Sequence, residues 1–126
     1  MIFGIERLIT DLRELGFTEA EQIADPQGTP FAVLKNFEVG AGRFCGKIVE
    51  LAIPAPPEYG RVVGSAIHLR SNPHLLDKPD TMPNVRNITD SSLGDTWRYW
   101  SHQFIYYPED TTKLLMAQIN GVFRHA

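Results

Sequence analysis

The stretch CGKIVELAIPAPPEYGRVVGSAIHLRS, residues 45–71, decides the fold because it holds two strand patterns on either side of a proline-rich break. In the first pattern, Val49, Leu51 and Ile53 alternate with their neighbours, which is typical of a β-strand. The prolines of APPEYG cannot donate the hydrogen bonds of a β-ladder, so the strand ends there. A second alternating run over residues 61–71 predicts the next strand of an antiparallel sheet.

Upstream of this stretch, the sequence predicts a helix followed by a hairpin. Apolar residues recur at helical spacing over residues 5–15, and Gly16 is a typical helix stop. Two short β-capable runs, residues 22–24 and 31–39, flank the turn signal Asp-Pro-Gln-Gly. We therefore expect an amphipathic N-terminal helix and then the first two strands of a meander.

Downstream, the sequence turns irregular and then helical. Residues 72–95 hold three prolines among Asn, Asp, Ser and Thr, which is typical of a long surface excursion. Asp95 can cap a short helix that carries two tryptophans and Phe104 on one face, and Asp110 can cap a final helix over residues 111–123. The expected fold class is α+β, with an N-terminal helix, a four-stranded antiparallel meander and a C-terminal helix.

Composition limits the classes of function. The chain has 126 residues, 43% of them hydrophobic, and a net charge of −3, so we expect one domain over residues 1–126 that does not bind nucleic acid. No apolar run is long enough to span a membrane, and the acidic N-terminal segment does not resemble a signal peptide. This predicts a cytoplasmic protein. The four histidines lack metal-binding spacing, so we expect no metal and no cofactor.

The aromatic segment 94–108 can be core or binding site. Trp97 and Trp100, three residues apart, would share one face of a helix, and we interpret them as structural core residues rather than a ligand platform. Arg98 and His102, four residues apart, would share the opposite and wetter face. These two residues fit either an ordinary solvated face or a partner-binding surface.

Two parts of the chain resemble a known family. The order GKIVELAIPAPPEYG followed by SAIHLRSNPHL resembles the core of the ubiquitin-conjugating (UBC) superfamily. LGDTWRYWSHQF, with the final helix, resembles the Thr-Trp-x-x-Trp-Ser-x-His segment of its bacterial branch, prokaryotic ubiquitin-conjugating family E. Thr96, Trp97, Trp100 and Ser101 match this pattern, and His102 falls one position before the family's histidine.

The resemblance implies a UBC-like fold and a role in a bacterial ubiquitin-like modification pathway. The implied partners are a ubiquitin-like protein, its activating enzyme, or both, encoded nearby. Asn72 and His74 keep the residue types of the family's His-Pro-Asn corner in altered order. Together with Arg98 and His102, they form the predicted partner-binding surface.

The chain departs from the family at the catalytic position. Conjugating enzymes carry their thioester-forming cysteine shortly after the His-Pro-Asn corner, but residues 71–95 contain no cysteine. A serine or threonine there would give a stable ester rather than a transferable thioester, because transfer needs a thiolate. We therefore expect a non-catalytic protein that acts by binding. A structural subunit that borrows the fold is one alternative.

A second alternative makes the chain an active ubiquitin-like protein transferase that uses Cys45, its only cysteine. Arg43 and Lys47 could favour the thiolate. Against this, Cys45 stands at the entry of the strand that runs to Ile53, and alternation places it on the apolar side of that strand. We therefore expect Cys45 to be buried and unreactive.

Overall fold

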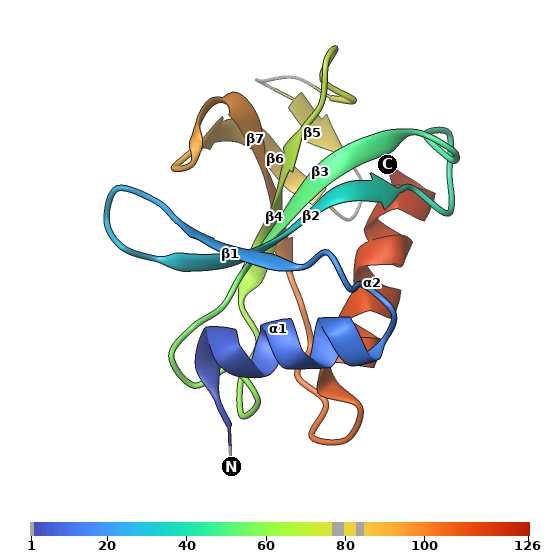
Figure 1. Cartoon of the computed structure of the whole chain (residues 1–126). Helices are drawn as coiled ribbons and strands as arrows, with labels where there is room; N and C mark the ends of the chain where they lie inside the picture. Colours follow the sequence, from blue (N-terminus) through green and yellow to red (C-terminus); the bar gives the residue numbers. More distant parts are fainter. Residues whose placement is uncertain (1, 77–79, 83–84) are drawn as a thin grey trace.

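A computed structural model describes residues 2–76, 80–82 and 85–126 of the chain. Within these residues, two helices and seven strands follow one another along the chain (Figure 1). They are α1 (Gly4–Glu14), β1 (Glu21–Ala24), β2 (Pro30–Glu38), β3 (Ile48–Pro54), β4 (Ser65–Arg70), β5 (Asp80–Met82), β6 (Val85–Ser91), β7 (Gly94–Gln103) and α2 (Thr111–His125). The predicted N-terminal helix, first hairpin, next two strands and final helix are confirmed, and β3 and β4 are shorter than expected.

All seven strands belong to one sheet, and every neighbouring pair is antiparallel. The strand order is β1-β2-β3-β4-β7-β6-β5, so β7 lies between β4 and β6. The prediction of a UBC-like fold with a four-stranded meander is therefore wrong. The sheet does not stop after β4, because residues 80–103 continue it with three more strands instead of leaving it for a helix.

The tryptophan segment is the clearest correction. Residues 94–103 form strand β7 and not a short helix capped by Asp95. Because side chains alternate along a strand, Trp97 and Trp100 lie on opposite faces of the sheet. Trp97 is paired with Arg70 and Trp100 with Ile67, and the two indoles are 4% and 1% exposed. A strand buried on both faces places tryptophans three residues apart in two separate clusters.

The predicted surface excursion over residues 72–95 also contains strands. Asp80 of β5 is paired with Ile88 of β6, and β6 turns tightly into β7 where Ser91 is paired with Gly94. Proline and polar residues are typical of loops, but short hairpin strands tolerate such composition when one strand lies at the edge of the sheet. The remaining positions of this segment, residues 77–79 and 83–84, lie outside the described residues.

The two faces of the sheet carry cores of different size. On one face, Leu8 and Leu12 of α1 and Leu115 and Ile119 of α2 pack in one apolar cluster with Trp100 and the inward-facing residues of the central strands. On the other face, a small second cluster is formed by Phe31, Val33, Ala52 and Trp97. Within the described residues, no helix contributes to this second cluster, and Ile23 and Leu93 pack against it.

Candidate functional site

A polar hollow lies at one end of β3, β4 and β7, beside the second cluster. It has a volume of about 500 Å³. Its lining residues come from two strands, the segment after β4 and the start of β7: Glu50, Arg70, Ser71, Asn72, His74, Asp95 and Thr96. The register of the sheet brings them together, because Glu50 is paired with Arg70 and Arg70 with Trp97. Asn72 and His74, both predicted as partner-binding residues, line this hollow.

The Arg70 side chain is held by two residues, Glu50 and Trp97. Its Nε and Nη2 atoms donate to the two carboxylate oxygens of Glu50, with 2.8 Å between Nη2 and Oε1. The guanidinium carbon lies 4.8 Å from the centroid of the Trp97 ring, a cation–π distance. The hydrogen bond from Arg70 holds the pKa of Glu50 below its usual range, so this carboxylate is charged at neutral pH. The hollow therefore contains one preorganised ion pair.

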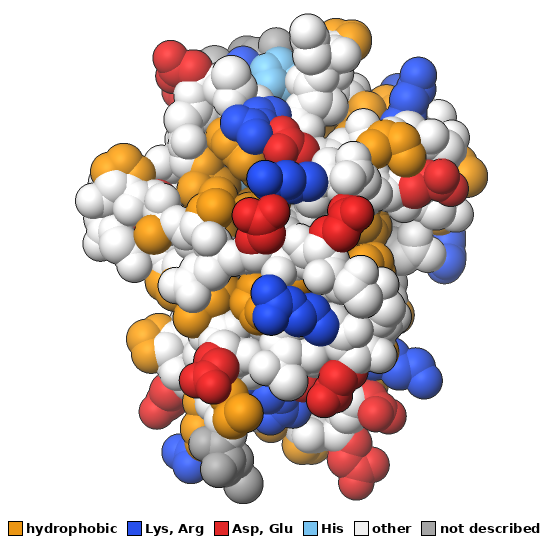
Figure 2. Space-filling model, viewed as in Figure 1, with side chains coloured by type: hydrophobic (Ala, Val, Ile, Leu, Met, Phe, Trp, Pro, Cys, Tyr) orange, Lys and Arg blue, Asp and Glu red, His pale blue; other side chains and the backbone are white. Residues whose placement is uncertain are grey.

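This ion pair extends into a row of alternating charges across four strands. Lys35 of β2 lies 3.2 Å from Glu21 of β1, next to the pair of Glu50 on β3 and Arg70 on β4. Figure 2 shows basic and acidic side chains alternating down the middle of this face. The charge of Lys35 also contributes to the lowered pKa of Glu50. Each pair satisfies its own charges, so the row stabilises the open face without giving it a strong net charge.

The other two predicted partner-binding residues do not line this hollow. Arg98 is half-buried in β7, and its Nη1 atom donates to the backbone oxygens of Asp95 at 2.8 Å and Trp97 at 2.9 Å. His102 lines a separate hollow of about 270 Å³, and its ring centroid lies 4.7 Å from that of Phe104. Arg98 thus holds the start of β7 in place, while His102 lies elsewhere on the strand.

Five residues of the hollow were not predicted as site residues, and three of them are charged: Glu50, Arg70 and Asp95. A signal for the first two was present, since opposite charges stand at matching positions of two consecutive predicted strands. The sequence pattern predicts Asp95 as a helix cap, and only the strand pairing of Arg70 with Trp97 brings Asp95, two residues before Trp97, to the same hollow. Residues that come together through strand pairing are identified from the register of the sheet and not from a local sequence motif.

Cys45 is exposed, so the prediction of a buried thiol is wrong. The chain does not enter β3 at this residue. The backbone N–H of Gly46 donates to the carbonyl of Val39, and Gly46 has a φ of 89°, a conformation that glycine adopts readily. These contacts close a tight loop between β2 and β3, and the strand begins only at Ile48. Cys45 therefore belongs to a turn, where the alternation of the strand does not apply.

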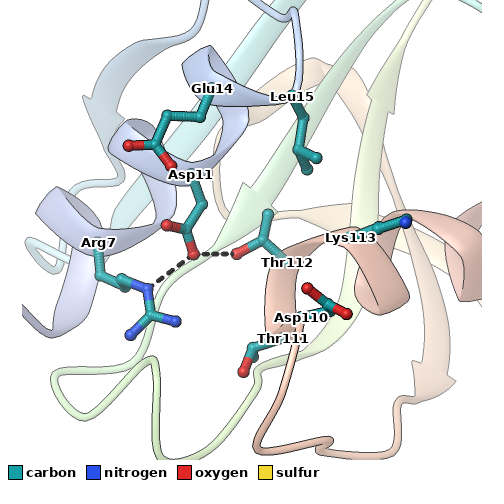
Figure 3. A pocket seen from close by; sticks show the side chains of 8 residues that line it. All are labelled: Arg7, Asp11, Glu14, Leu15, Asp110, Thr111, Thr112 and Lys113. Carbon is teal, nitrogen blue, oxygen red and sulfur yellow. Dashed lines mark hydrogen bonds and ion pairs between the residues drawn. The ribbon is translucent and has the colours of Figure 1, made fainter.

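A second polar hollow of about 210 Å³ lies between α1 and the start of α2 (Figure 3). The Asp11 carboxylate accepts from Arg7 Nε and from Thr112 Oγ1, both at 2.7 Å. The hydroxyl of the fully buried Tyr59 lies 2.7 Å from Thr112 Oγ1, and burial raises the pKa of Tyr59 to about 12. Because these groups satisfy one another, the network ties α1, α2 and the loop after β3 together.

A serine–histidine pair lies on the open face of the sheet. His68 Nδ1 and Ser91 Oγ are 2.7 Å apart, and the Ser91 oxygen also accepts from the N–H of Leu93 at 3.0 Å. His68 is only 5% exposed, and burial lowers its pKa to about 4 despite the nearby charge of Asp25. A base this weak abstracts protons poorly at neutral pH. The pair anchors the β6–β7 turn to β4.

Exposed apolar residues stand on two hydrogen-bonded loops at the opposite end of the β4–β7 pair. We call Val62, Ile105 and Tyr107 the apolar loop surface; they are 40%, 61% and 41% exposed. The Tyr106 hydroxyl donates to the carbonyl of Gly60 at 3.0 Å, which joins the two loops that carry these residues (Figure 1). These loops follow β7 and precede β4 respectively, so they lie one strand length from the hollow of Asn72 and His74.

The fold and these surfaces define a sheet-dominated α+β protein with an open, charged sheet face. Comparisons with family models, curated proteins and solved structures give no match. The described helices include none that is long and apolar enough to cross a membrane. In the same part of the chain, no three His, Cys, Asp or Glu side chains gather where they could hold a metal ion.

Proposed function

We propose that this protein is a non-catalytic binding domain of a bacterial ubiquitin-like modification pathway and acts in the cytoplasm. Its partner is a ubiquitin-like protein or the corresponding activating enzyme. The observation that carries the proposal is the apolar loop surface of Val62, Ile105 and Tyr107. Exposed apolar residues that gather on neighbouring segments are typical of protein interaction sites.

Ile105 is the most exposed residue of this surface, and its backbone is held by α2. The Gln118 side chain of α2 accepts from the N–H of Ile105 at 2.8 Å and donates to its carbonyl at 2.9 Å. The side chain itself is 61% exposed. An apolar anchor that is fixed before binding loses little conformational entropy when a partner covers it. Complete burial of such a side chain contributes about 1.5–3 kcal/mol.

The pathway is proposed from the family E resemblance of the segment around Trp97 and Trp100. The lack of a cysteine over residues 71–95 favours binding over group transfer, because no thiol stands where the family forms its thioester. Thr89, Ser91 and Ser92 do not replace it. Ser91 is engaged by His68 and by the N–H of Leu93.

The test is calorimetric titration of this protein with the ubiquitin-like protein and with the activating enzyme encoded beside it. We expect Ile105→Ser to weaken binding about tenfold or more, since an apolar anchor is lost. Ile48→Ser is the matched control, because Ile48 is 53% exposed and lies at the opposite end of the sheet. Equal affinity of Ile105→Ser and the parent, or equal losses in both variants, would contradict the proposal.

One observation favours a second function, that of an active conjugating enzyme. The Cys45 thiol is exposed and stands between Arg43 and Lys47 in sequence, so an activating enzyme could reach it. Incubation with activating enzyme, modifier and ATP would then give an adduct that thiols cleave and that Cys45→Ser lacks. Under the binding proposal no such adduct forms, and Cys45→Ser binds partners like the parent.

A further inference from the structure

The polar hollow at the end of β3, β4 and β7 has an unbalanced charge. Arg70 and Glu50 neutralise each other through their two hydrogen bonds. Asp95 also lines the hollow, and within the described residues its carboxylate takes part in no hydrogen bond or ion pair. One negative charge therefore faces the hollow without a partner. A basic group would balance it, whereas an acidic group would meet two carboxylates.

The surroundings of Asp95 provide neutral acceptors for the remaining protons of a basic group. The Ser71 and Thr96 hydroxyls and the Asn72 amide line the same hollow. An ammonium group has three donors and no acceptor, so one carboxylate and several neutral oxygens suit it. The backbone of Asp95 is also held in place, because the Arg98 side chain donates a hydrogen bond to the Asp95 carbonyl at 2.8 Å.

From this arrangement we infer that the hollow binds a basic side chain, a lysine above all, carried by a protein partner. The inference rests on the proposed function in taking the partner to be a protein, and it adds a second contact at the far end of the β4–β7 pair. The volume of about 500 Å³ accommodates a lysine side chain together with the adjoining backbone. Asp95 makes the charged contact, and Asn72 belongs to the wall of the same site.

The experiment is an NMR titration of the isolated protein with Nα-acetyl-lysine methylamide and, separately, with its uncharged norleucine analogue. We expect the lysine probe to shift the amide signals of residues 70–74 and 94–97, with a dissociation constant in the millimolar range. Asp95→Asn should weaken this binding about three- to fivefold, the usual size of an exposed charge contact. Glu109→Gln is the control, since Glu109 is an exposed carboxylate at the opposite end of the molecule.

The outcomes separate this inference from the proposed function. Because the probe is a small molecule, the titration does not depend on any contact of Ile105 with a partner. Equal shifts from the lysine and norleucine probes, unchanged affinity in Asp95→Asn, or shifts confined to other residues would each overturn the lysine site. Unchanged NMR signals of residues away from the hollow would verify that the Asp95→Asn variant is folded.

Discussion

His68 shows how one buried residue couples the stability of the fold to pH. It packs edge-on against Phe31 at 4.8 Å and Tyr99 at 5.3 Å between ring centroids, and its Nδ1 atom faces Ser91. Burial disfavours the charged imidazolium, so the folded-state pKa of His68 falls from 6.5 to about 4. Between pH 6.5 and about 4, His68 is therefore protonated in the unfolded chain and neutral in the folded chain. The stabilisation from neutral His68 is complete above pH 6.5 and is lost as the pH falls toward 4.

We expect the free energy of unfolding to drop by about 2–3 kcal/mol between pH 7 and 4.5 because of this residue. Urea denaturation at both pH values measures the drop. His68→Gln removes the titrating group and should reduce the dependence on pH by most of that amount, whatever its stability at pH 7. His125→Gln, an exposed histidine at the end of α2, should leave the pH dependence unchanged. A pH dependence that survives in His68→Gln would rule out this assignment.

At the scale of elements, the end of α1 has a specific backbone cap. The N–H of Phe17 donates to the carbonyl of Leu12 at 2.9 Å, and the N–H of Gly16 donates to the carbonyl of Arg13 at 3.1 Å. This pair of bonds is the Schellman motif, which needs a residue of positive φ, and Gly16 has a φ of 104°. The turn directs the chain into Ala20 and β1, so the cap sets where the sheet begins.

Two glycine substitutions test whether Gly16 is needed for its positive φ. One is at Gly16 itself, and the other is at a glycine inside a helix, where alanine is favoured. Gly16→Ala should destabilise the protein by about 1 kcal/mol or more, because alanine resists the positive φ although no atom blocks its Cβ. Gly121→Ala, inside α2 and also with open space for a Cβ, should stabilise it by about 0.5–1 kcal/mol. Chemical denaturation measures both changes. Changes of the same sign would show that backbone conformation does not control these positions.

The elements that the sequence predicts well are those that end at clear turn residues. α1 has a regular apolar period and ends at Gly16, and the β1–β2 hairpin is marked by its Asp-Pro-Gln-Gly turn, so their positions could be predicted directly. The positions of Trp97 and Trp100 could not, because two buried tryptophans three residues apart fit one face of a helix as well as the two opposite faces of a strand. The prediction that Cys45 is buried failed for a local reason. The turn at Gly46 delays the start of β3 to Ile48, three residues after Cys45. The polar hollow depends on pairing between distant strands, and a single sequence does not specify that pairing.

At the scale of the whole molecule, the β4–β7 pair separates two surfaces. Ser65 is paired with Gln103 beside the apolar loop surface, and Arg70 is paired with Trp97 beside the polar hollow. Five residues of extended strand span about 17 Å. Because strands of one sheet do not slide past each other, this spacing is fixed. One partner that contacts both surfaces must present an apolar patch and a basic side chain at that separation.

The spacing predicts the behaviour of a double variant. Ile105→Ser and Asp95→Asn lie too far apart to share contacts, so their losses of binding free energy for one protein partner should add to within about 0.5 kcal/mol. Calorimetry on the parent, both single variants and the double variant measures this. A double variant that binds no more weakly than Ile105→Ser would show that the hollow does not engage the same partner.

The exposed Cys45 also makes the protein convenient to label. It is the only cysteine of the chain, so a maleimide dye or a biotin attaches at a single known position. That position, in the loop between β2 and β3, is remote in sequence from Val62 and Ile105, whose loops lie past the other end of the strands. A molecule immobilised through this thiol would present the apolar loop surface to solution in a uniform orientation. Stored without reductant, the same thiol would link two copies through a disulfide.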